Sequence, residues 1–323
     1  MSALTAWGRL WQDGAADSFG ATGHSPATQT PLAGLWLREF AALTPHSRVL
    51  DIATGAGVLP RLLLHICEHA TVECDAVDAA ELPQAQLHQT TTPGHPQLRF
   101  HERVFAENLP FADGSFDLVT SQFGIEYAEL PLALAQACRV LKPGGHLCLV
   151  MHHADGRPAA LAREEFQHSQ WLLQTSDWPD AAREMLLPLS LIRSPADQFR
   201  LQTDPLLITI RQRYDLALAT LQGRAAASAA PDLLHDVQAW MSQVFQTAAQ
   251  QGHVKGLVAW QRLMALVADG AVRVQDLLDH VLDAARMDNV RLQLVNAGFD
   301  VEVHAVVEQG HCMGWQVLAR RTG

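Results

Sequence analysis

The feature that most constrains the fold is a short apolar run followed by a glycine-containing turn and a helical pattern. Residues 48–53 (RVLDIA) form the run, which is short and apolar enough for a buried strand. The turn TGAG follows at once, and residues 58–69 then carry apolar side chains at helical spacing. A buried strand that passes through a glycine turn into a helix predicts the first unit of a parallel α/β sheet.

The same alternation continues along the chain. Further strands are expected at 71–78, 98–105, 116–123 and 146–152, with helices at 82–90 and 132–141. Two last strands, 300–308 and 314–321, are joined by a short link and predict an antiparallel pair. The expected fold class is therefore α/β, with a doubly wound, mostly parallel sheet of seven strands.

Between the fifth and sixth expected strands the chain carries only helical patterns. We therefore expect a sheet domain formed by residues 1–154 and 289–323, and an all-helical insertion at 155–288. Both ends of the insertion attach next to the carboxyl edge of the sheet, so we expect it to cap a site there. Its tryptophans suit a substrate pocket and a homodimer face equally well; they are Trp171, Trp178, Trp240 and Trp260.

Two helices are expected before the first strand. Trp7 and Trp11 stand at i, i+4 spacing, which places both indoles on one face of an N-terminal helix. Residues 20–31 have the composition of a loop, and residues 31–43 show the period of an amphipathic helix.

Composition excludes several classes of protein. The net charge is −11, from 34 acidic and 23 basic side chains, so neither nucleic acid nor an anionic membrane surface is an expected partner. No stretch approaches the roughly 18 consecutive apolar residues of a membrane span. The first residues also lack the pattern of a signal peptide, which predicts a cytoplasmic protein. The 5 cysteines lack CxxC spacing and the histidines lack ligand spacing, so we expect no disulfide framework and no metal.

The glycine turn is a candidate ligand site, because open parallel sheets bind ligands beyond the carboxyl ends of their strands. Gly55 and Gly57 allow a close approach of the backbone to a ligand. The turn is not GxGxxG, since Val58 and Leu59 stand where a third small residue would be needed. Asp51 would also repel an anionic pyrophosphate. The turn therefore suits a cationic or hydroxyl-rich ligand.

These motifs together resemble the class I S-adenosylmethionine-dependent methyltransferases, in particular the branch with the ubiquinone/menaquinone C-methyltransferases. The resemblance rests on VLDIATGAG, on Asp78 after the second strand, on ENLPFADGSFDLV (107–119) and on RVLKPGGHL (139–147). It covers residues 48–153 and the last two strands, and it implies a Rossmann-like fold with S-adenosylmethionine as cofactor. The cofactor-binding residues that it implies are Asp51, Ala53, Thr54, Gly55, Gly57, Asp78, Ala79, Phe105, Ala106, Glu107, Gln122 and Phe123.

The resemblance also implies roles for single residues. The carboxylate in the place of Asp51 positions the amino-acid part of the cofactor, and the acid in the place of Asp78 accepts both ribose hydroxyls. The family commonly has an Asp that accepts the adenine amine where this chain has Phe105. We expect Phe105 to pack on adenine and Ala106 to offer its backbone amide, while Glu107 or a main-chain carbonyl accepts from the amine.

Side chains beyond the fourth and fifth strands are candidates for substrate chemistry. We expect Glu126 and Tyr127 to face the methyl acceptor; the alternative is a solvated acid and a packed ring. His152 and His153 end the fifth strand, and at most one of them can face the site because successive strand residues point to opposite sides. A histidine there would take a proton from a substrate hydroxyl or amine, or else be a satisfied polar residue at a strand end.

Methyl transfer requires no covalent nucleophile, because the acceptor only has to be held near the methyl group in a dry site. The absence of a hydrolase triad or a P-loop from the sequence agrees with this chemistry. The sequence therefore predicts an S-adenosylmethionine-dependent methyltransferase that acts on oxygen, nitrogen or carbon of a small molecule. The alternative is a binding protein of the same fold without turnover.

Overall fold

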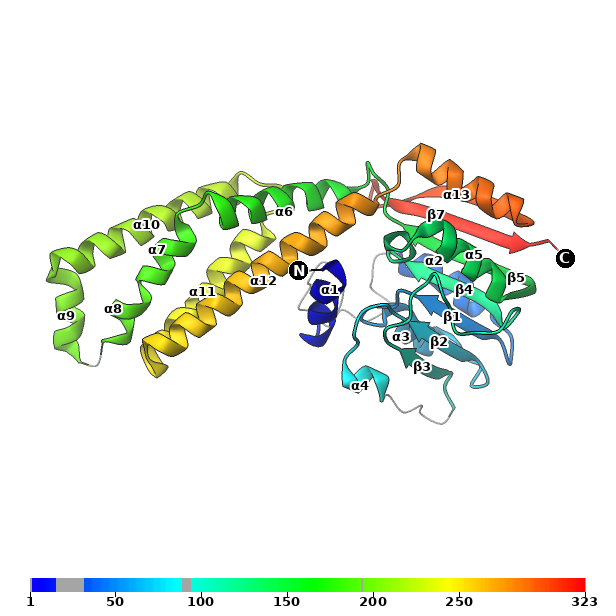
Figure 1. Ribbon diagram of the computed structural model, residues 1–323, viewed down its shortest axis with the longest axis horizontal. Helices are drawn as coiled ribbons and strands as arrows, with labels where there is room; N and C mark the ends of the chain where they lie inside the picture. Colours follow the sequence, from blue (N-terminus) through cyan, green and yellow to red (C-terminus); the bar gives the residue numbers. More distant parts are fainter. Residues whose placement is uncertain (1, 16–31, 89–93, 193, 323) are drawn as a thin grey trace. The chain divides into compact units, whose positions relative to one another are not determined.

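The computed structural model describes residues 2–15, 32–88, 94–192 and 194–322 (Figure 1). The strands are β1 (Arg48–Ile52), β2 (Glu73–Val77), β3 (Gln97–His101), β4 (Phe116–Gln122), β5 (Leu141–Met151), β6 (Phe299–Glu308) and β7 (His311–Arg321). The helices before β5 are α1 (Ala3–Gln12), α2 (Ala33–Ala41), α3 (Val58–Ile66), α4 (Gln84–Leu87), the 3₁₀ turn η2 (Ile125–Tyr127) and α5 (Leu130–Val140). The helices after β5 are α6 (Arg157–Gln174), α7 (Trp178–Glu184), α8 (Leu186–Ser190), α9 (Pro195–Thr203), α10 (Pro205–Ala226), α11 (Asp232–Gln251), α12 (His253–His280) and α13 (Ala284–Asn296).

The strands form one sheet of 7 strands in the order β3-β2-β1-β4-β5-β7-β6. Strands β1 to β5 run parallel, and β7 pairs antiparallel with both β5 and β6. The predicted α/β class and mostly parallel sheet are confirmed. Because chain order reverses between β1 and β4, the carboxyl ends of β1, β2 and β4 meet at the point where ligands bind in such sheets.

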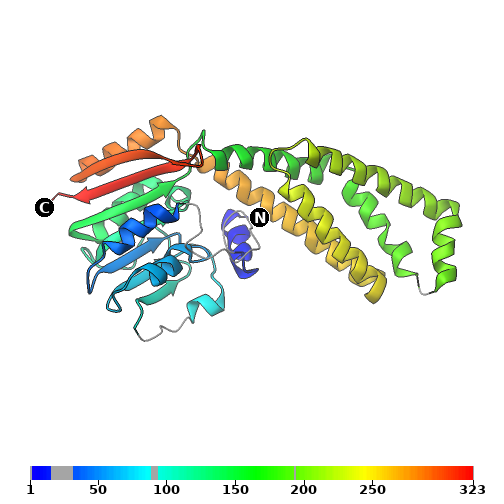
Figure 2. The same cartoon turned by 180° about the vertical axis from the view of Figure 1, so that it is seen from behind.

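Helices cover both faces of the sheet, because its central strands are apolar on both sides (Figures 1 and 2). One face is covered by α2 and α3, whose Trp36 and Leu62 are fully buried. The other face is covered by α5 and α13, which bury Leu134 and Leu294. The sheet is therefore packed between two separate apolar cores.

The third strand is shorter than its apolar pattern predicts. It ends at His101, whereas the prediction extended it to residue 105. The backbone turns at Arg103, which has a φ of 58°, and the Val104 N–H donates to the carbonyl of Asp78. Because of this turn, Phe105 lies outside the sheet and beside the end of β2.

Other differences are local. The KPGG segment at 142–145 lies inside β5, where the ladder passes from the pair Phe116–Leu141 to the pair Leu118–His146. Of the helix predicted at 82–90, the structure shows only α4, and residues 89–90 lie outside the described residues. The loop predicted at 20–31 also lies outside them.

The chain divides into two compact units, of which one combines Met1–Ala159 with Asp276–Gly323 and the other is Ala160–Gln275. The first unit contains the sheet. Residues 276–288, which the sequence placed in the insertion, fall within the sheet unit, and the neighbouring α13 packs on β6 and α5.

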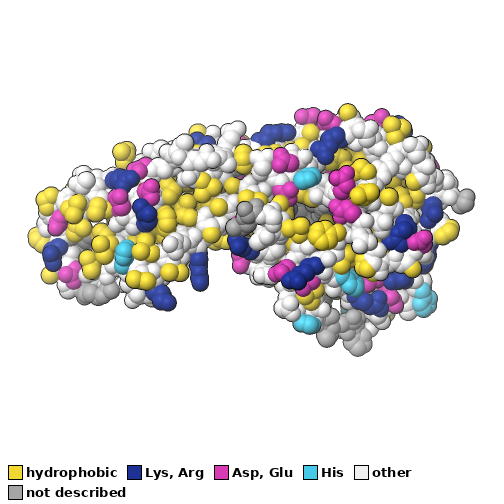
Figure 3. Space-filling view, in the orientation of Figure 1, with side chains coloured by type: hydrophobic (Ala, Val, Ile, Leu, Met, Phe, Trp, Pro, Cys, Tyr) yellow, Lys and Arg dark blue, Asp and Glu magenta, His cyan; other side chains and the backbone are white. Residues whose placement is uncertain are grey.

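The second unit is helical throughout its described residues and has its own apolar core. Trp178 is fully buried in that core, and Trp171, Trp240 and Trp260 pack against it. The structure therefore corrects the expectation that Trp178 would line a pocket or a dimer face. Other apolar side chains remain on the surface of this unit, among them Phe199, and hydrophobic atoms are visible on it in Figure 3. The homodimer face stays a prediction.

Among the described residues, none of the helices combines the length and the apolar character that crossing a membrane requires.

Candidate functional site

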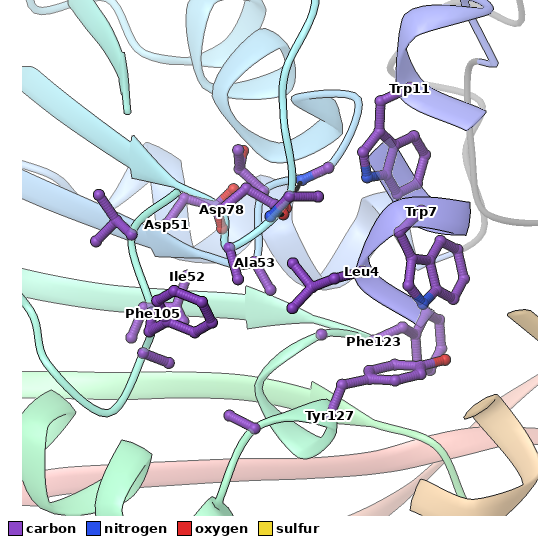
Figure 4. Close-up of a pocket in the computed structure, with 18 of the residues that line it drawn as sticks. Leu4, Trp7, Trp11, Asp51, Ile52, Ala53, Asp78, Phe105, Phe123 and Tyr127 are labelled. Atoms are coloured by element: carbon purple, nitrogen blue, oxygen red, sulfur yellow. Dashed lines mark hydrogen bonds between the residues drawn. The ribbon is translucent and has the colours of Figure 1, made fainter. Parts of the chain in front are cut away.

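A pocket of about 320 Å³ opens at the carboxyl edge of β1, β2 and β4 (Figure 4). Its volume is within the range of small-molecule sites. All but one of the predicted cofactor residues line it, and these are Asp51, Ala53, Thr54, Gly55, Asp78, Ala79, Phe105, Ala106, Glu107, Gln122 and Phe123. The exception is Gly57, which begins α3 with a φ of 77°. A Cβ at Gly57 would lie 3.0 Å from Gln86 Nε2, so this glycine serves packing behind the turn.

Asp78 shapes the glycine turn as well as the pocket. Its Oδ2 accepts a hydrogen bond from the Gly55 N–H at 2.7 Å, and its Oδ1 accepts from the Ala80 N–H at 2.8 Å. Burial raises the pKa of the Asp78 carboxyl, while these two bonds oppose the rise. Each oxygen keeps a second lone pair for a hydroxyl of a ligand.

The turn is also pressed closely against α1. Gly55 has a φ of 50°, and a Cβ there would lie 2.8 Å from the ring of Trp11. Only glycine permits both the backbone conformation and this contact. Glycine at position 55 therefore allows the close contact between the turn and α1.

Asp51 lies at the base of the pocket and is 2% exposed. Its Oδ1 accepts a hydrogen bond from Thr120 Oγ1 at 2.9 Å. Burial raises the pKa of Asp51 from 3.8 to about 7; the hydroxyls of Thr54 and Thr120 lower this pKa, and the carboxylate of Asp78 adds to the rise. A cationic group bound beside Asp51 would favour its ionised form and lower the pKa again.

Two pocket residues hold a backbone conformation that side chains other than glycine rarely adopt. Ala53, after β1, has a φ of 56°, and Phe123, after β4, has a φ of 53°. Ser121 Oγ joins the two strand ends by donating to the carbonyl of Ile52 at 2.8 Å. A Cβ at Gly124 would lie 2.5 Å from the Cβ of Ala53, so the two loops are in close contact. Backbone strain of this kind concentrates at functional sites.

Helix α1 supplies an aromatic wall that the sequence only partly predicted. Trp7 and Trp11 line the pocket as stacked rings with centroids 5.7 Å apart. Leu4 also lines it, one helical turn before Trp7, and that spacing is a signal by which it could have been found. Trp7 Nε1 donates to Asp276 Oδ2 at 2.8 Å. Asp276 was missed, because it stands near the end of α12 and belongs to no motif.

Tyr127 lies in the pocket between Trp7 and His280, with ring centroids 5.7 Å and 5.3 Å away. Burial, assisted by the carboxylates of Glu126 and Asp276, raises the pKa of the Tyr127 phenol. The phenol therefore stays protonated near neutral pH and can donate a hydrogen bond. The hydrogen bond to Asp276 also raises the pKa of His280.

Glu126 and His152 do not line the pocket, which corrects the prediction that Glu126 faces the acceptor. Both are 1% exposed. Glu126 Oε1 accepts from the backbone N–H of His152 at 2.9 Å and lies 2.8 Å from its Nδ1. The His152 ring lies behind Phe123, with ring centroids 4.4 Å apart. His153 also stays outside the lining and stacks on Trp315 at 4.2 Å.

The segment after β3 forms the side of the pocket opposite α1. The Phe105 ring lies across the pocket from Trp7 and Trp11 (Figure 4). Phe105 is 50% exposed, and Ala106 beside it is buried. Glu107 Oε1 accepts from the Glu129 N–H at 2.7 Å, so this carboxylate is held at the start of α5.

The parallel sheet, and the carboxylates at the ends of two adjacent strands around a glycine turn, agree with the resemblance to the class I S-adenosylmethionine-dependent methyltransferases. Residues 50–149 match the family of methyltransferase domains. The chain contains a domain of this family, as its motifs predicted.

Curated relatives share this part of the chain. A demethylmenaquinone methyltransferase from Deinococcus radiodurans is 38% identical over 141 residues, which are 41% of this chain and 56% of the relative. A ubiquinone/menaquinone biosynthesis C-methyltransferase from Ectopseudomonas mendocina is 35% identical over 131 residues, 38% of this chain and 50% of the relative. The chain thus spans about half the length of these relatives.

The YcgJ protein of Bacillus subtilis aligns over 90% of this chain and 97% of its own, with 18% identity and a TM-score of 0.36.

Proposed function

We propose that this protein transfers the methyl group of S-adenosylmethionine to oxygen, nitrogen or carbon of a small molecule. The observation that carries the proposal is that Asp51, Asp78 and the glycine turn meet in one pocket, and that the other side of this pocket is aromatic. One side suits a polar, cationic nucleoside cofactor, and the other suits an organic acceptor.

The pocket suits the cofactor part by part. The free lone pairs of Asp78 can accept two adjacent ribose hydroxyls. Asp51 can hold the ammonium of the amino-acid part, and Trp7 and Trp11 offer ring faces to a sulfonium cation. When bound, the cofactor supplies a methyl group already activated by positive sulfur. The protein then has to orient the acceptor and exclude water.

Tyr127 is the residue we propose to orient the acceptor. It lines the pocket between rings, and its protonated phenol can donate to an acceptor oxygen or nitrogen. The relatives named above act, by their names, on quinone precursors. An aromatic acceptor of that general kind would stack on Trp7 or Phe123.

A binding protein without turnover is the alternative, and one observation favours it. Glu126 and His152 are withdrawn from the pocket, so the candidate base predicted from the sequence is not in contact with a ligand there. Methylation of a neutral amine or of an already ionised group needs no such base, which is why we place the enzyme first.

The test has two stages. Calorimetry with S-adenosylmethionine and S-adenosylhomocysteine measures cofactor binding, and the absence of binding by either refutes the enzyme. Labelled S-adenosylmethionine is then incubated with the protein and fractionated metabolite extracts. Transfer of label to a small molecule supports the proposal, with a heat-denatured sample and the Asp78→Ala variant as controls. Cofactor binding without any transfer supports the alternative.

A further inference from the structure

Two aromatic rings and a carboxylate meet at one end of the pocket. The rings of Trp7 and Tyr127 are nearly perpendicular, with an interplanar angle of 80° and centroids 5.7 Å apart. Trp7 Nε1 donates to Asp276 Oδ2 at 2.8 Å, so the carboxylate lies at the edge of the indole. All three residues line the pocket and belong to the sheet unit, and Figure 4 shows both rings away from Asp51 and Asp78. We call these three residues the aromatic corner.

The carboxylate of the aromatic corner is held at both oxygens. Oδ2 of Asp276 is bonded to Trp7, and Oδ1 lies 3.2 Å from Nδ1 of His280, which is outside the described lining. Each oxygen keeps a second lone pair. The Asp276 side chain is 16% exposed, so a cation that enters the corner would meet a largely desolvated carboxylate beside two aromatic rings. Aromatic rings attract cations, most strongly where water is excluded.

The charges around the whole pocket also favour a cation. The acidic residues of the lining are Asp51, Asp78, Glu107 and Asp276, and no Lys, Arg or His is among the described residues that line the pocket. An anionic acceptor would therefore approach four carboxyl groups without a cationic partner. A phenol would have to lose its proton to become a strong nucleophile, yet burial and nearby carboxylates raise the pKa of the phenol that already lies here, Tyr127. An amine meets neither obstacle.

We propose that the acceptor is a small amine, whose nitrogen lies in the aromatic corner and becomes an ammonium cation there. This inference rests on the proposed function and narrows the acceptor atom to nitrogen. The nitrogen lone pair bonds to the methyl carbon as the bond from that carbon to sulfur breaks, and the electron pair of the broken bond stays on sulfur. The positive charge thereby moves to nitrogen, where Trp7, Tyr127 and Asp276 stabilise it. A tertiary amine suits this site best, because its product has no proton to lose.

The first experiment measures whether the complex with S-adenosylhomocysteine binds a cation in preference to a neutral molecule of the same shape. The probes are choline and 3,3-dimethylbutan-1-ol, which differ only in having charged nitrogen or neutral carbon at the centre of the three methyl groups. Calorimetry should show that choline binds at least about tenfold more tightly. Equal affinities, or no binding of either probe, would overturn the inference.

Variants of the aromatic corner show where the cation binds. Asp276→Asn keeps an oxygen that can accept from Trp7 but removes the charge, so the preference for choline should fall at least about threefold. Tyr127→Leu should also lower the preference because it removes a ring, whereas Tyr127→Phe keeps the ring and should retain it. Asp279→Asn is the matched control, since it removes the same charge from an exposed position outside the lining and should leave the preference unchanged.

The preference is a ratio of two affinities in one protein, so a variant that only loosens the pocket weakens both probes and leaves the ratio unchanged. Thermal unfolding checks that each variant folds. If Asp276→Asn and Tyr127→Leu both keep the full preference of the wild type, the cation does not bind in the aromatic corner and the inference is wrong.

The second experiment determines the charge of the methylated product. Labelled products from the metabolite extract are separated from unreacted cofactor and applied to a cation-exchange resin at about pH 5, where amines are protonated. A methylated amine should be retained, whereas a neutral methyl ether or a neutral C-methylated ring passes through. Labelled product found only in the unretained fraction would overturn the inference.

Failure of the inference and failure of the proposed function give different results. If S-adenosylhomocysteine does not bind, or if no label is transferred to any small molecule, the proposed function fails and the inference fails with it. If label is transferred to a product that the resin does not retain, the proposed function stands and only the inference fails.

Discussion

Replacing Asp78 by Ala tests the ribose site and the glycine turn at once. The carboxylate makes two bonds to backbone amides, at 2.7 and 2.8 Å, and we propose that it accepts two more from ribose. Hydrogen bonds to a charged group contribute about 1.5–3 kcal/mol each. Loss of the ribose bonds should therefore weaken S-adenosylhomocysteine at least about tenfold, since about 1.4 kcal/mol is a factor of ten. Loss of the amide bonds should also lower the free energy of unfolding.

These two effects can be separated by changing the ligand. An analogue of S-adenosylhomocysteine that lacks the ribose 2′-hydroxyl should bind the wild type about tenfold more weakly than the parent compound. In the Asp78→Ala protein the same deletion should have almost no effect, because its partner is already gone. Calorimetry of the four combinations gives the coupling between Asp78 and the hydroxyl. An equal effect of the deletion in both proteins would show that Asp78 does not hold the ribose.

Four further predictions follow, two on Asp51, one on the wall formed by α1 and one on Tyr127. Burial raises the pKa of Asp51 to about 7, so this carboxyl is protonated below that pH when no ligand is bound. Binding of the cofactor ammonium should therefore release a proton, and the affinity for the cofactor should rise with pH towards 7. Calorimetry in buffers of different ionisation enthalpy measures that proton, and Asp51→Asn should abolish it; a pH-independent affinity would contradict the assignment. The same raised pKa contributes to the free energy of unfolding. This contribution is fully present below about pH 4 and is lost as the pH rises through 7, so the wild type should lose more stability over that range than Asp51→Asn. Trp7→Phe and Asp276→Ala each remove the bond between Trp7 Nε1 and Asp276, so each should speed cofactor dissociation about fivefold in stopped-flow fluorescence, and the double variant should be no faster than either. Additive effects would mean that this bond does not hold α1 over the cofactor. Tyr127→Phe should leave the dissociation constant of the cofactor unchanged and lower turnover of an identified acceptor, whereas unchanged turnover would make the phenol structural.

The part of the pocket that we propose for the cofactor was predictable because its residues lie at strand ends or directly after them. In a parallel sheet the residues after β1, β2 and β4 must meet at one edge, and the alternation of strands and helices specifies that edge. Asp51, Gly55 and Asp78 lie where this rule puts them. The exact end of β3 was not predictable, because the turn at Arg103 depends on a bond between Val104 and the carbonyl of Asp78.

The part of the pocket that we propose for the acceptor was predictable only partly, because its geometry depends on residues far away in sequence. Glu126 and Tyr127 are neighbours, but a 3₁₀ turn has about three residues per turn, so their side chains diverge by roughly a third of a rotation. Tyr127 enters the pocket and Glu126 turns inwards to His152. Strand alternation showed that the side chains of His152 and His153 must point to opposite sides of the sheet. The contact with Glu126 determines which of the two is buried.

The distribution of charge in the pocket bears on the kind of acceptor that can react there. Asp51 and Asp78 face the cofactor side, Glu107 is held by α5, and Asp276 is held between Trp7 and His280. Tyr127 stays protonated because burial and neighbouring carboxylates raise its pKa. Each acidic side chain in the described lining therefore already has a hydrogen-bond partner within the protein. We therefore expect an acceptor whose nucleophile needs no proton removed by the protein, such as a neutral amine or a group that ionises in water before it binds.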